Sequence, residues 1–133
     1  MPTELKMLVW VAVLTALLWL PYILARIISS GAIETLTYKA DSNPLPLWAE
    51  RAKKAHYNSV ENLVIFAVLV LTDHLLQVSN EATITSSVAY FWLRLAYYPL
   101  YILNIPFGRT LSFAGAWFAL ACIAYQILST GVG

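Results

Sequence analysis

The chain has 133 residues, of which 60% are hydrophobic and 11% charged, and its formal net charge is +1. Soluble domains carry about twice that charged fraction, so the composition indicates an integral membrane protein of one compact unit. The near-neutral charge excludes nucleic acid as an electrostatic partner. The single cysteine, Cys122, excludes an intramolecular disulfide framework and a cysteine-based metal cage.

Four segments approach the about 20 apolar residues that a bilayer crossing needs. The predicted fold class is all-α, an integral membrane four-helix bundle that forms a single domain over residues 1–133. The first segment is too long for a signal-peptide core and ends in Leu24-Ala25-Arg26, so we interpret it as a retained span. Pro21 is expected either to kink this helix or to mark where it starts to leave the membrane core. We expect the helices at about residues 5–28, 47–78, 85–103 and 110–128.

The connections between these segments are rich in turn-forming residues. Residues 29–46 form the longest predicted loop, with Pro46 near the first turn of the second helix, and the other two connections are 79–83 and 104–108. The positive-inside rule therefore places loops one and three in the cytoplasm and both termini outside. The basic residues that border loops one and three are Arg26, Lys39, Arg51, Lys53, Lys54 and Arg109.

A stripe of polar side chains runs down one face of the second helix, within about one third of its circumference. Polar groups at membrane depth are costly unless they face a partner helix or a wet cavity. Binding of anionic lipid would explain the lysines, and interhelical hydrogen bonds would explain the deeper residues. A ligand site explains the whole stripe and is the interpretation we favour. Its members are Arg51, Lys54, Asn58, Glu61 and Asn62.

The third helix carries one face of aromatic side chains around an arginine. An aromatic belt would lie at a single membrane depth, whereas this face extends over three turns. We therefore expect it to pack against the second helix, with Arg94 paired with Glu61 or with a ligand carboxylate. The residues of this face are Tyr90, Arg94, Tyr97, Tyr98 and Tyr101.

The fourth helix is predicted to open with Arg109-Thr110. A helix N-terminus with a cation and a hydroxyl would suit an anion, and a positive-inside anchor is the alternative; both remain open. His56 projects away from the stripe and is assigned a packing role. Asp73-His74 is interpreted as a polar cap at the outer end of the second helix. No metal-ligand spacing, phosphate-binding glycine loop or serine nucleophile elbow is present in the sequence.

The polar residues of helices two to four resemble the MAPEG family, the membrane-associated proteins in eicosanoid and glutathione metabolism, and most of all its short bacterial branch. Its helix-two signature, approximately Glu-Arg-x-x-Arg-Ala-x-x-Asn-x-x-Glu, corresponds here to residues 50–61, which read Glu-Arg-Ala-Lys-Lys-Ala-His-Tyr-Asn-Ser-Val-Glu. A second signature is Arg-x-x-Tyr, then a tyrosine, then an arginine that opens the last helix. It is matched by Arg94, Tyr97, Tyr101 and Arg109.

The resemblance implies a homotrimer in the bacterial inner membrane, with glutathione bound between neighbouring subunits near the cytoplasmic face. It implies that Arg109 is the catalytic arginine, with Arg51 and Arg26 as further candidates for the site. The glutathione ligands that it implies are Lys54, Asn58, Glu61 and either Tyr97 or Tyr101.

The chemistry of glutathione fits these residue types. Its two carboxylates suit the cations Arg51, Lys54 or Arg94, and its ammonium group suits Glu61. A thiol reacts as its thiolate, which Arg109 would stabilise while Thr110 donates a second hydrogen bond. A lipid or another lipophilic molecule would arrive from the bilayer as cosubstrate.

Two residues depart from the family pattern. Lys54 stands where glutathione-using members commonly have arginine, and lysine lacks the planar fork that binds a carboxylate through two parallel bonds. Phe113 stands where several members have tyrosine. The first hypothesis is a glutathione transferase, with or without peroxidase activity, that acts on lipophilic electrophiles. The alternatives are a non-catalytic lipid-binding or scaffold protein of the same fold, and a proton-coupled transporter that uses Glu61.

Overall fold

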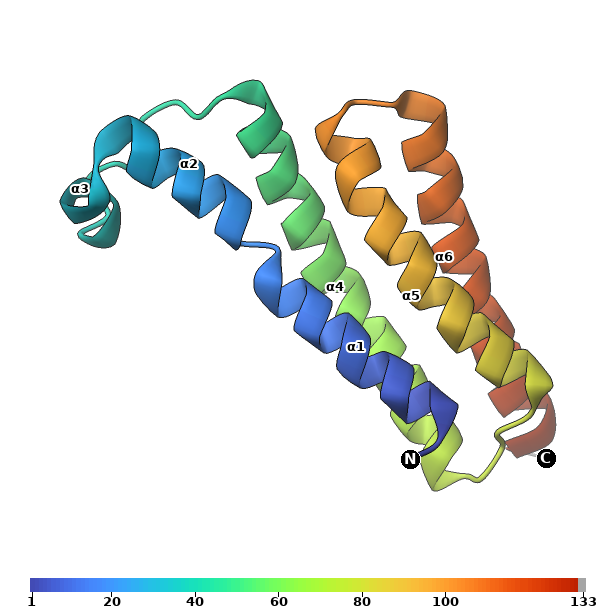
Figure 1. The fold of residues 1–133 in the computed structure, drawn as a ribbon. Helices are drawn as coiled ribbons and strands as arrows, with labels where there is room; N and C mark the ends of the chain where they lie inside the picture. Colours follow the sequence, from blue (N-terminus) through green and yellow to red (C-terminus); the bar gives the residue numbers. More distant parts are fainter. Residues whose placement is uncertain (132–133) are drawn as a thin grey trace.

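The computed structural model describes residues 1–131, and every regular element in that range is helical, as the predicted all-α class requires. Helices α1, α4, α5 and α6 run alongside one another, while α2 and α3 diverge from them (Figure 1). The elements in chain order are α1 Thr3–Leu17, α2 Leu20–Ser30, α3 Ala32–Leu36, α4 Leu47–Leu75, α5 Glu81–Ile102, α6 Pro106–Gln126 and the π-helical turn η1 Ile127–Gly131.

Within residues 1–131, three stretches are long and apolar enough to cross a membrane: Thr3–Ser30, Leu47–Leu75 and Pro106–Thr130. Large apolar side chains are exposed along them, among them Val13, Val68 and Phe118. Such extensive exposed apolar surface suits hydrocarbon rather than water. The protein is therefore an integral membrane protein.

The first predicted helix, 5–28, is broken into α1 and α2. Helix α1 ends at Leu17 and α2 begins at Leu20, with Pro21 in its first turn. Proline lacks the N–H that would continue the helical ladder and its ring crowds the preceding turn, so the expected kink is confirmed. On α5, the Tyr98 hydroxyl donates to the Leu18 carbonyl oxygen at this break, at 2.9 Å. Tyr98 therefore faces the kink.

The loop between the first two spans contains a short helix that the sequence did not predict. Helix α3 follows Gly31, whose φ of +89° lies where side-chain-bearing residues are strained. Helix α4 begins directly after Pro46 and ends at Leu75, against an expected end at 78.

Helices α5 and α6 begin earlier than expected because their starts carry specific N-terminal signals. Asn80 accepts a hydrogen bond from the Thr83 backbone N–H at 3.0 Å, and Thr83 accepts one from the Asn80 backbone N–H at 2.9 Å. This capping box starts α5 at Glu81 rather than 85. Helix α6 starts at Pro106 rather than 110, since the first turn of a helix needs no proline N–H.

The main core lies where α5 packs against α1, α4 and α6. At its centre the fully buried ring of Phe66 on α4 stacks on that of Tyr90 on α5, with centroids 4.1 Å apart. Gly115 lets α6 approach closely, because a Cβ there would lie 3.0 Å from a Leu93 methyl group. This packing fixes the rotation of α4 and α5 about their axes. The rotation in turn determines which side chains of the two helices meet at their ends.

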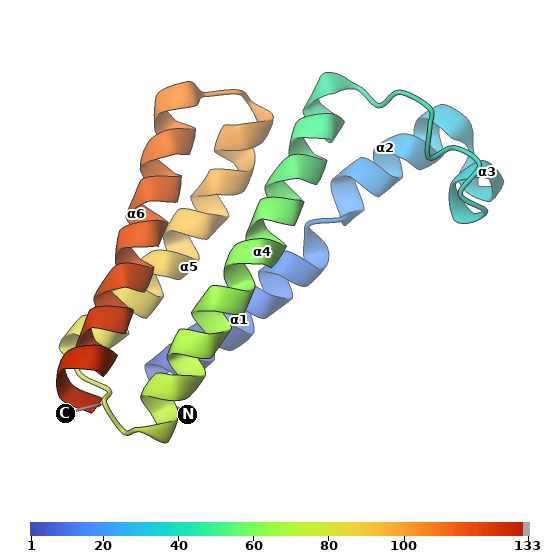
Figure 2. The ribbon, with the colours of Figure 1, turned by 180° about the vertical axis from the view of Figure 1, so that it is seen from behind.

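The helices divide the molecule into two ends. The start of α1, the turn η1 and the α4–α5 connection lie at one end, and the α3–α4 and α5–α6 connections lie at the other (Figures 1 and 2). The starts of α4 and α6, with the basic residues Arg51, Lys54 and Arg109, are thereby brought to the same end.

Candidate functional site

Five of the residues proposed to bind glutathione line a single hollow between α4 and α5, which we call the α4–α5 hollow. Its volume is about 250 Å³. The α4 residues are spaced by three or four positions and therefore share a helix face, as do the two tyrosines of α5. The lining residues are Lys54, Tyr57, Asn58, Glu61, Tyr97 and Tyr101.

A second hollow of about 270 Å³ lies between α5 and α6, and we call it the α5–α6 hollow. It is lined by Tyr97, Arg109, Thr110 and Phe113. Tyr97 lines both hollows, and its ring centroid is 5.6 Å from that of Tyr101 and 6.2 Å from that of Phe113. The two hollows therefore adjoin across one side chain.

Arg109 also connects the two hollows. Its guanidinium carbon lies 4.9 Å from the ring centroid of Tyr101, within the range of a cation–π interaction. Because Tyr101 lines the α4–α5 hollow, the cation borders both spaces. The side chain is partly exposed, so it is accessible to a ligand.

The expectation that Arg109 and Thr110 open the last helix is wrong. Helix α6 starts at Pro106, and the Arg109 backbone N–H already donates to the Ile105 carbonyl oxygen at 2.9 Å. The N–H groups free at this helix start are therefore those of Phe107 and Gly108. Any attraction of an anion in the α5–α6 hollow must come from the guanidinium and hydroxyl groups rather than from the amides of Arg109 and Thr110.

Arg94 is buried between α4 and α5, with 2% of its surface exposed. One terminal nitrogen donates to Asn58 Oδ1 and to Ser59 Oγ, both at 2.8 Å. The guanidinium carbon lies 4.3 Å from the ring centroid of Tyr97. The expected pairing with Glu61 is wrong, since Glu61 is exposed and Arg94 bonds Asn58 and Ser59 instead.

The hydrogen bonds to Asn58 determine what this residue offers a ligand. Its Oδ1 accepts from Arg94 and, at 3.3 Å, from Asn62 Nδ2, which also donates to the Asn58 carbonyl oxygen at 2.9 Å. A side-chain amide has one oxygen acceptor and two N–H donors. With the oxygen occupied, Asn58 presents its N–H groups, which suit a carbonyl or carboxylate oxygen of a ligand.

Other polar residues of the same end have different roles. Arg51 lies one helical turn before Lys54 and lines neither hollow. Arg26 is buried and donates to the backbone carbonyl oxygens of Ala40 and Asn43, so it holds the loop that follows α3. His56 Nδ1 is 2.7 Å from the Tyr22 hydroxyl, which confirms its packing role.

Sequence reasoning missed two residues of the site. Tyr57 lines the α4–α5 hollow three positions after Lys54, so helical spacing was the signal that would have found it. Ser59 carries no such signal, because only the position of Arg94 makes its hydroxyl a partner.

The fold and the two hollows define a class of protein: an all-helical integral membrane protein with a polar site at one end of its helices. The MAPEG family model matches residues 7–129, nearly the whole chain, and the protein belongs to the MAPEG family. No curated protein and no solved structure matches the chain. Members of this family use glutathione as substrate or cofactor, and they include glutathione transferases and related proteins.

We predict that Ser59→Ala lowers the free energy of unfolding by about 1.5–3 kcal/mol, the range for a hydrogen bond to a charged group, because it removes one of the acceptors of the buried guanidinium. The matched control is Ser112→Ala. Ser112 is equally buried, at 5% exposed, but its hydroxyl only donates to the Arg109 carbonyl oxygen of its own helix. Denaturant unfolding of the two variants in one detergent measures the difference, and equal losses would contradict the role of Ser59.

Proposed function

We propose that this protein is a membrane glutathione transferase that conjugates glutathione to lipophilic electrophiles. The observation that carries the proposal is the meeting of the two hollows at Tyr97. Because the two hollows adjoin, Arg109, a cation that can stabilise a thiolate, lies beside groups that can hold the rest of a tripeptide. These groups belong to a chain whose family uses glutathione.

In the proposed complex, glutathione lies along the α4–α5 hollow. Lys54 pairs with one of its carboxylates and Glu61 with its ammonium group, while the second carboxylate reaches Arg51, one turn earlier on α4. Asn58 donates an N–H to a carbonyl oxygen, since its own oxygen is occupied. Tyr97 and Tyr101 form the wall toward α6. Arg94 acts as a positioning residue that orients Asn58 rather than as a direct ligand.

The thiol of glutathione lies in the α5–α6 hollow. The Arg109 guanidinium lowers the pKa of the thiol, and the Thr110 hydroxyl donates to the sulfur. The thiolate attacks an electrophilic carbon and forms a carbon–sulfur bond. In a substitution, the electron pair of the broken bond departs with the leaving group. In an addition to a double bond, the electron pair of that bond is protonated. The same thiolate would support a peroxidase reaction, in which two glutathione molecules reduce a hydroperoxide to an alcohol and water.

The bilayer supplies the second substrate. In this proposal α5 is the fourth membrane crossing and completes a four-helix bundle. Loops one and three, with the site, face the cytoplasm of a bacterial inner membrane, and the termini lie outside. This orientation is supported by the basic residues at the site end. The partly exposed ring of Phe113 lets a lipophilic molecule enter the α5–α6 hollow from the side.

The proposed assembly is a homotrimer in which a neighbouring subunit closes each site. Ligand pockets usually enclose about 300–1,000 Å³, and each hollow alone is smaller than that. A second chain packed over the hollows would supply the missing wall and exclude water from the thiolate.

We predict that light scattering with subtraction of the bound detergent gives the mass of three chains for the purified protein. The expected trimer should persist when the protein is diluted, because an interface that completes a site buries a large apolar area. A monomeric particle that still binds glutathione would contradict the shared site.

Ultraviolet difference absorbance tests the central proposal. Titration of the purified protein with glutathione at neutral pH should produce a thiolate band, and Arg109→Ala should abolish it, because the cation that holds the thiolate is gone. Lys53→Ala is the matched control: it removes a cation from the same end that lines neither hollow, and it should leave the band unchanged. Absence of the band in the wild-type protein, with no glutathione binding by calorimetry, would overturn the proposal and favour the non-catalytic lipid-binding alternative.

Phe113→Tyr provides a second test of where the sulfur lies. The new hydroxyl would stand in the α5–α6 hollow with Arg109 and would donate a hydrogen bond to the thiolate. The variant should show a lower apparent pKa for the thiolate band and an unchanged dissociation constant for S-methylglutathione, which has no thiol to ionise. An unchanged pKa profile would place the sulfur elsewhere.

A further inference from the structure

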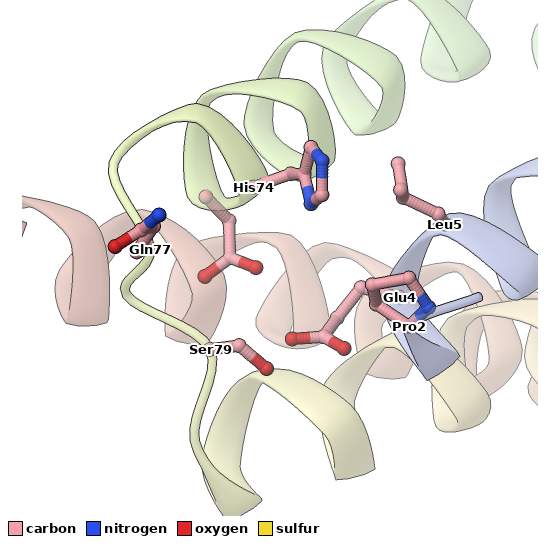
Figure 3. Close-up of a pocket in the computed structure, with 7 residues that line it drawn as sticks. Pro2, Glu4, Leu5, His74, Gln77 and Ser79 are labelled. Atoms are coloured by element: carbon pink, nitrogen blue, oxygen red, sulfur yellow. The ribbon is translucent and has the colours of Figure 1, made fainter.

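Two carboxyl groups are buried at the end of the molecule opposite the candidate site. Glu4 on α1 is 2% exposed and Asp73 on α4 is 1% exposed. They line a cavity of about 300 Å³ between the start of α1, the end of α4 and the α4–α5 connection (Figure 3). Asp73 was expected to form a polar cap at the membrane interface. It lies instead in a buried cluster with Glu4, which sequence reasoning had not connected to it.

The carboxyl groups have few hydrogen-bond donors. The Thr83 hydroxyl donates to Glu4 Oε2 at 3.0 Å, but it lies at the same distance from the Asn80 carbonyl oxygen. Glu4 Oε1 and Asp73 Oδ1 have no partner. The Glu4 and Asp73 carboxyl groups line the same cavity, and the Ser79 hydroxyl lies beside Glu4 (Figure 3).

Among the residues that line the cavity, no lysine or arginine balances this charge. His74 is the basic side chain there, and it is exposed. Lys6 on α1 is exposed and lies outside the lining, and α5 contributes the hydroxyl of Thr83 and no cation. Two carboxylates that face each other away from water repel one another and lose hydration, so a cation bound between them would be stabilising.

We propose that this cavity binds a hydrated divalent cation of the hard type, such as Ca²⁺ or Mg²⁺. Glu4 and Asp73 supply two negative charges, and the hydroxyl oxygen of Ser79 is a neutral ligand at the rim (Figure 3). Hard cations prefer oxygen ligands, and the cavity leaves room for waters to complete the shell. The ion would clamp the start of α1 to the end of α4, and the site is independent of glutathione.

Calorimetry tests the site. The purified full-length protein, stripped with EDTA in detergent, is titrated with CaCl₂ and separately with MgCl₂. We expect saturable binding of one ion per chain and a rise in unfolding temperature. Asp73→Asn and Glu4→Gln should each weaken binding at least tenfold. The matched control, Glu81→Gln, removes an exposed carboxylate near the same connection that does not line the cavity and should bind as the wild type does.

The stability of the metal-free protein gives an independent readout. Without metal, Asp73→Asn should unfold at the same temperature as the wild type or higher, because it removes the like-charge repulsion; with metal, only the wild type should gain stability. Absence of saturable binding by the wild-type protein in the millimolar range would overturn the proposal, even if neither variant folds. The proposal would also be overturned if the unfolding temperature rises as the pH falls and does not change with either metal. That result would mean that a proton shared by the two carboxyl groups relieves their repulsion.

Discussion

The hydrogen bonds from Arg94 to Asn58 and Ser59 are the interaction on which the site depends. One guanidinium nitrogen holds two consecutive residues of α4, at 2.8 Å each, and the same group lies against the ring of Tyr97. Because a buried cation is costly without partners, these two bonds restrict the rotation of α4 against α5, although Nε of Arg94 has no hydrogen-bond partner. That rotation decides which side of Asn58 meets a ligand and where Tyr97 stands between the two hollows.

The membrane explains why polar chemistry is confined to the two ends of the helices. The middle of the helices is held by apolar contacts such as the stack of Phe66 on Tyr90. At one end the cations Arg51, Lys54 and Arg109 lie near the starts of α4 and α6. At the other, Glu4 and Asp73 form a buried negative cluster. Charged groups are costly in hydrocarbon, so they collect at the ends of the helices. At each end, a bound molecule or ion of opposite charge would stabilise them.

Much of the candidate site was accessible to sequence reasoning because helical spacing places residues on faces. Lys54, Asn58 and Glu61 recur at intervals of three and four, and the structure finds them in one hollow. The same reasoning failed where the contact joins different helices. Arg94 was paired with Glu61 because opposite charges attract, whereas the axial position of α5 puts it beside Asn58 and Ser59. Tyr98 was grouped with the site face, yet it bonds the carbonyl of Leu18 at the Pro21 break.

The amino-acid sequence by itself determined the class of this protein, its family signatures and the side chains available for chemistry. Composition and segment length are enough for the class, since a long apolar segment in a bilayer satisfies its own backbone groups as a helix. The tertiary structure alone decided which of these side chains meet: that Tyr97 separates two adjoining hollows, that Arg109 lies against Tyr101, and that Glu4 joins Asp73. Periodicity specifies the face of a helix, but the rotation and the axial shift between helices follow from packing. Packing depends on residues that are distant in the chain, such as Gly115 against Leu93.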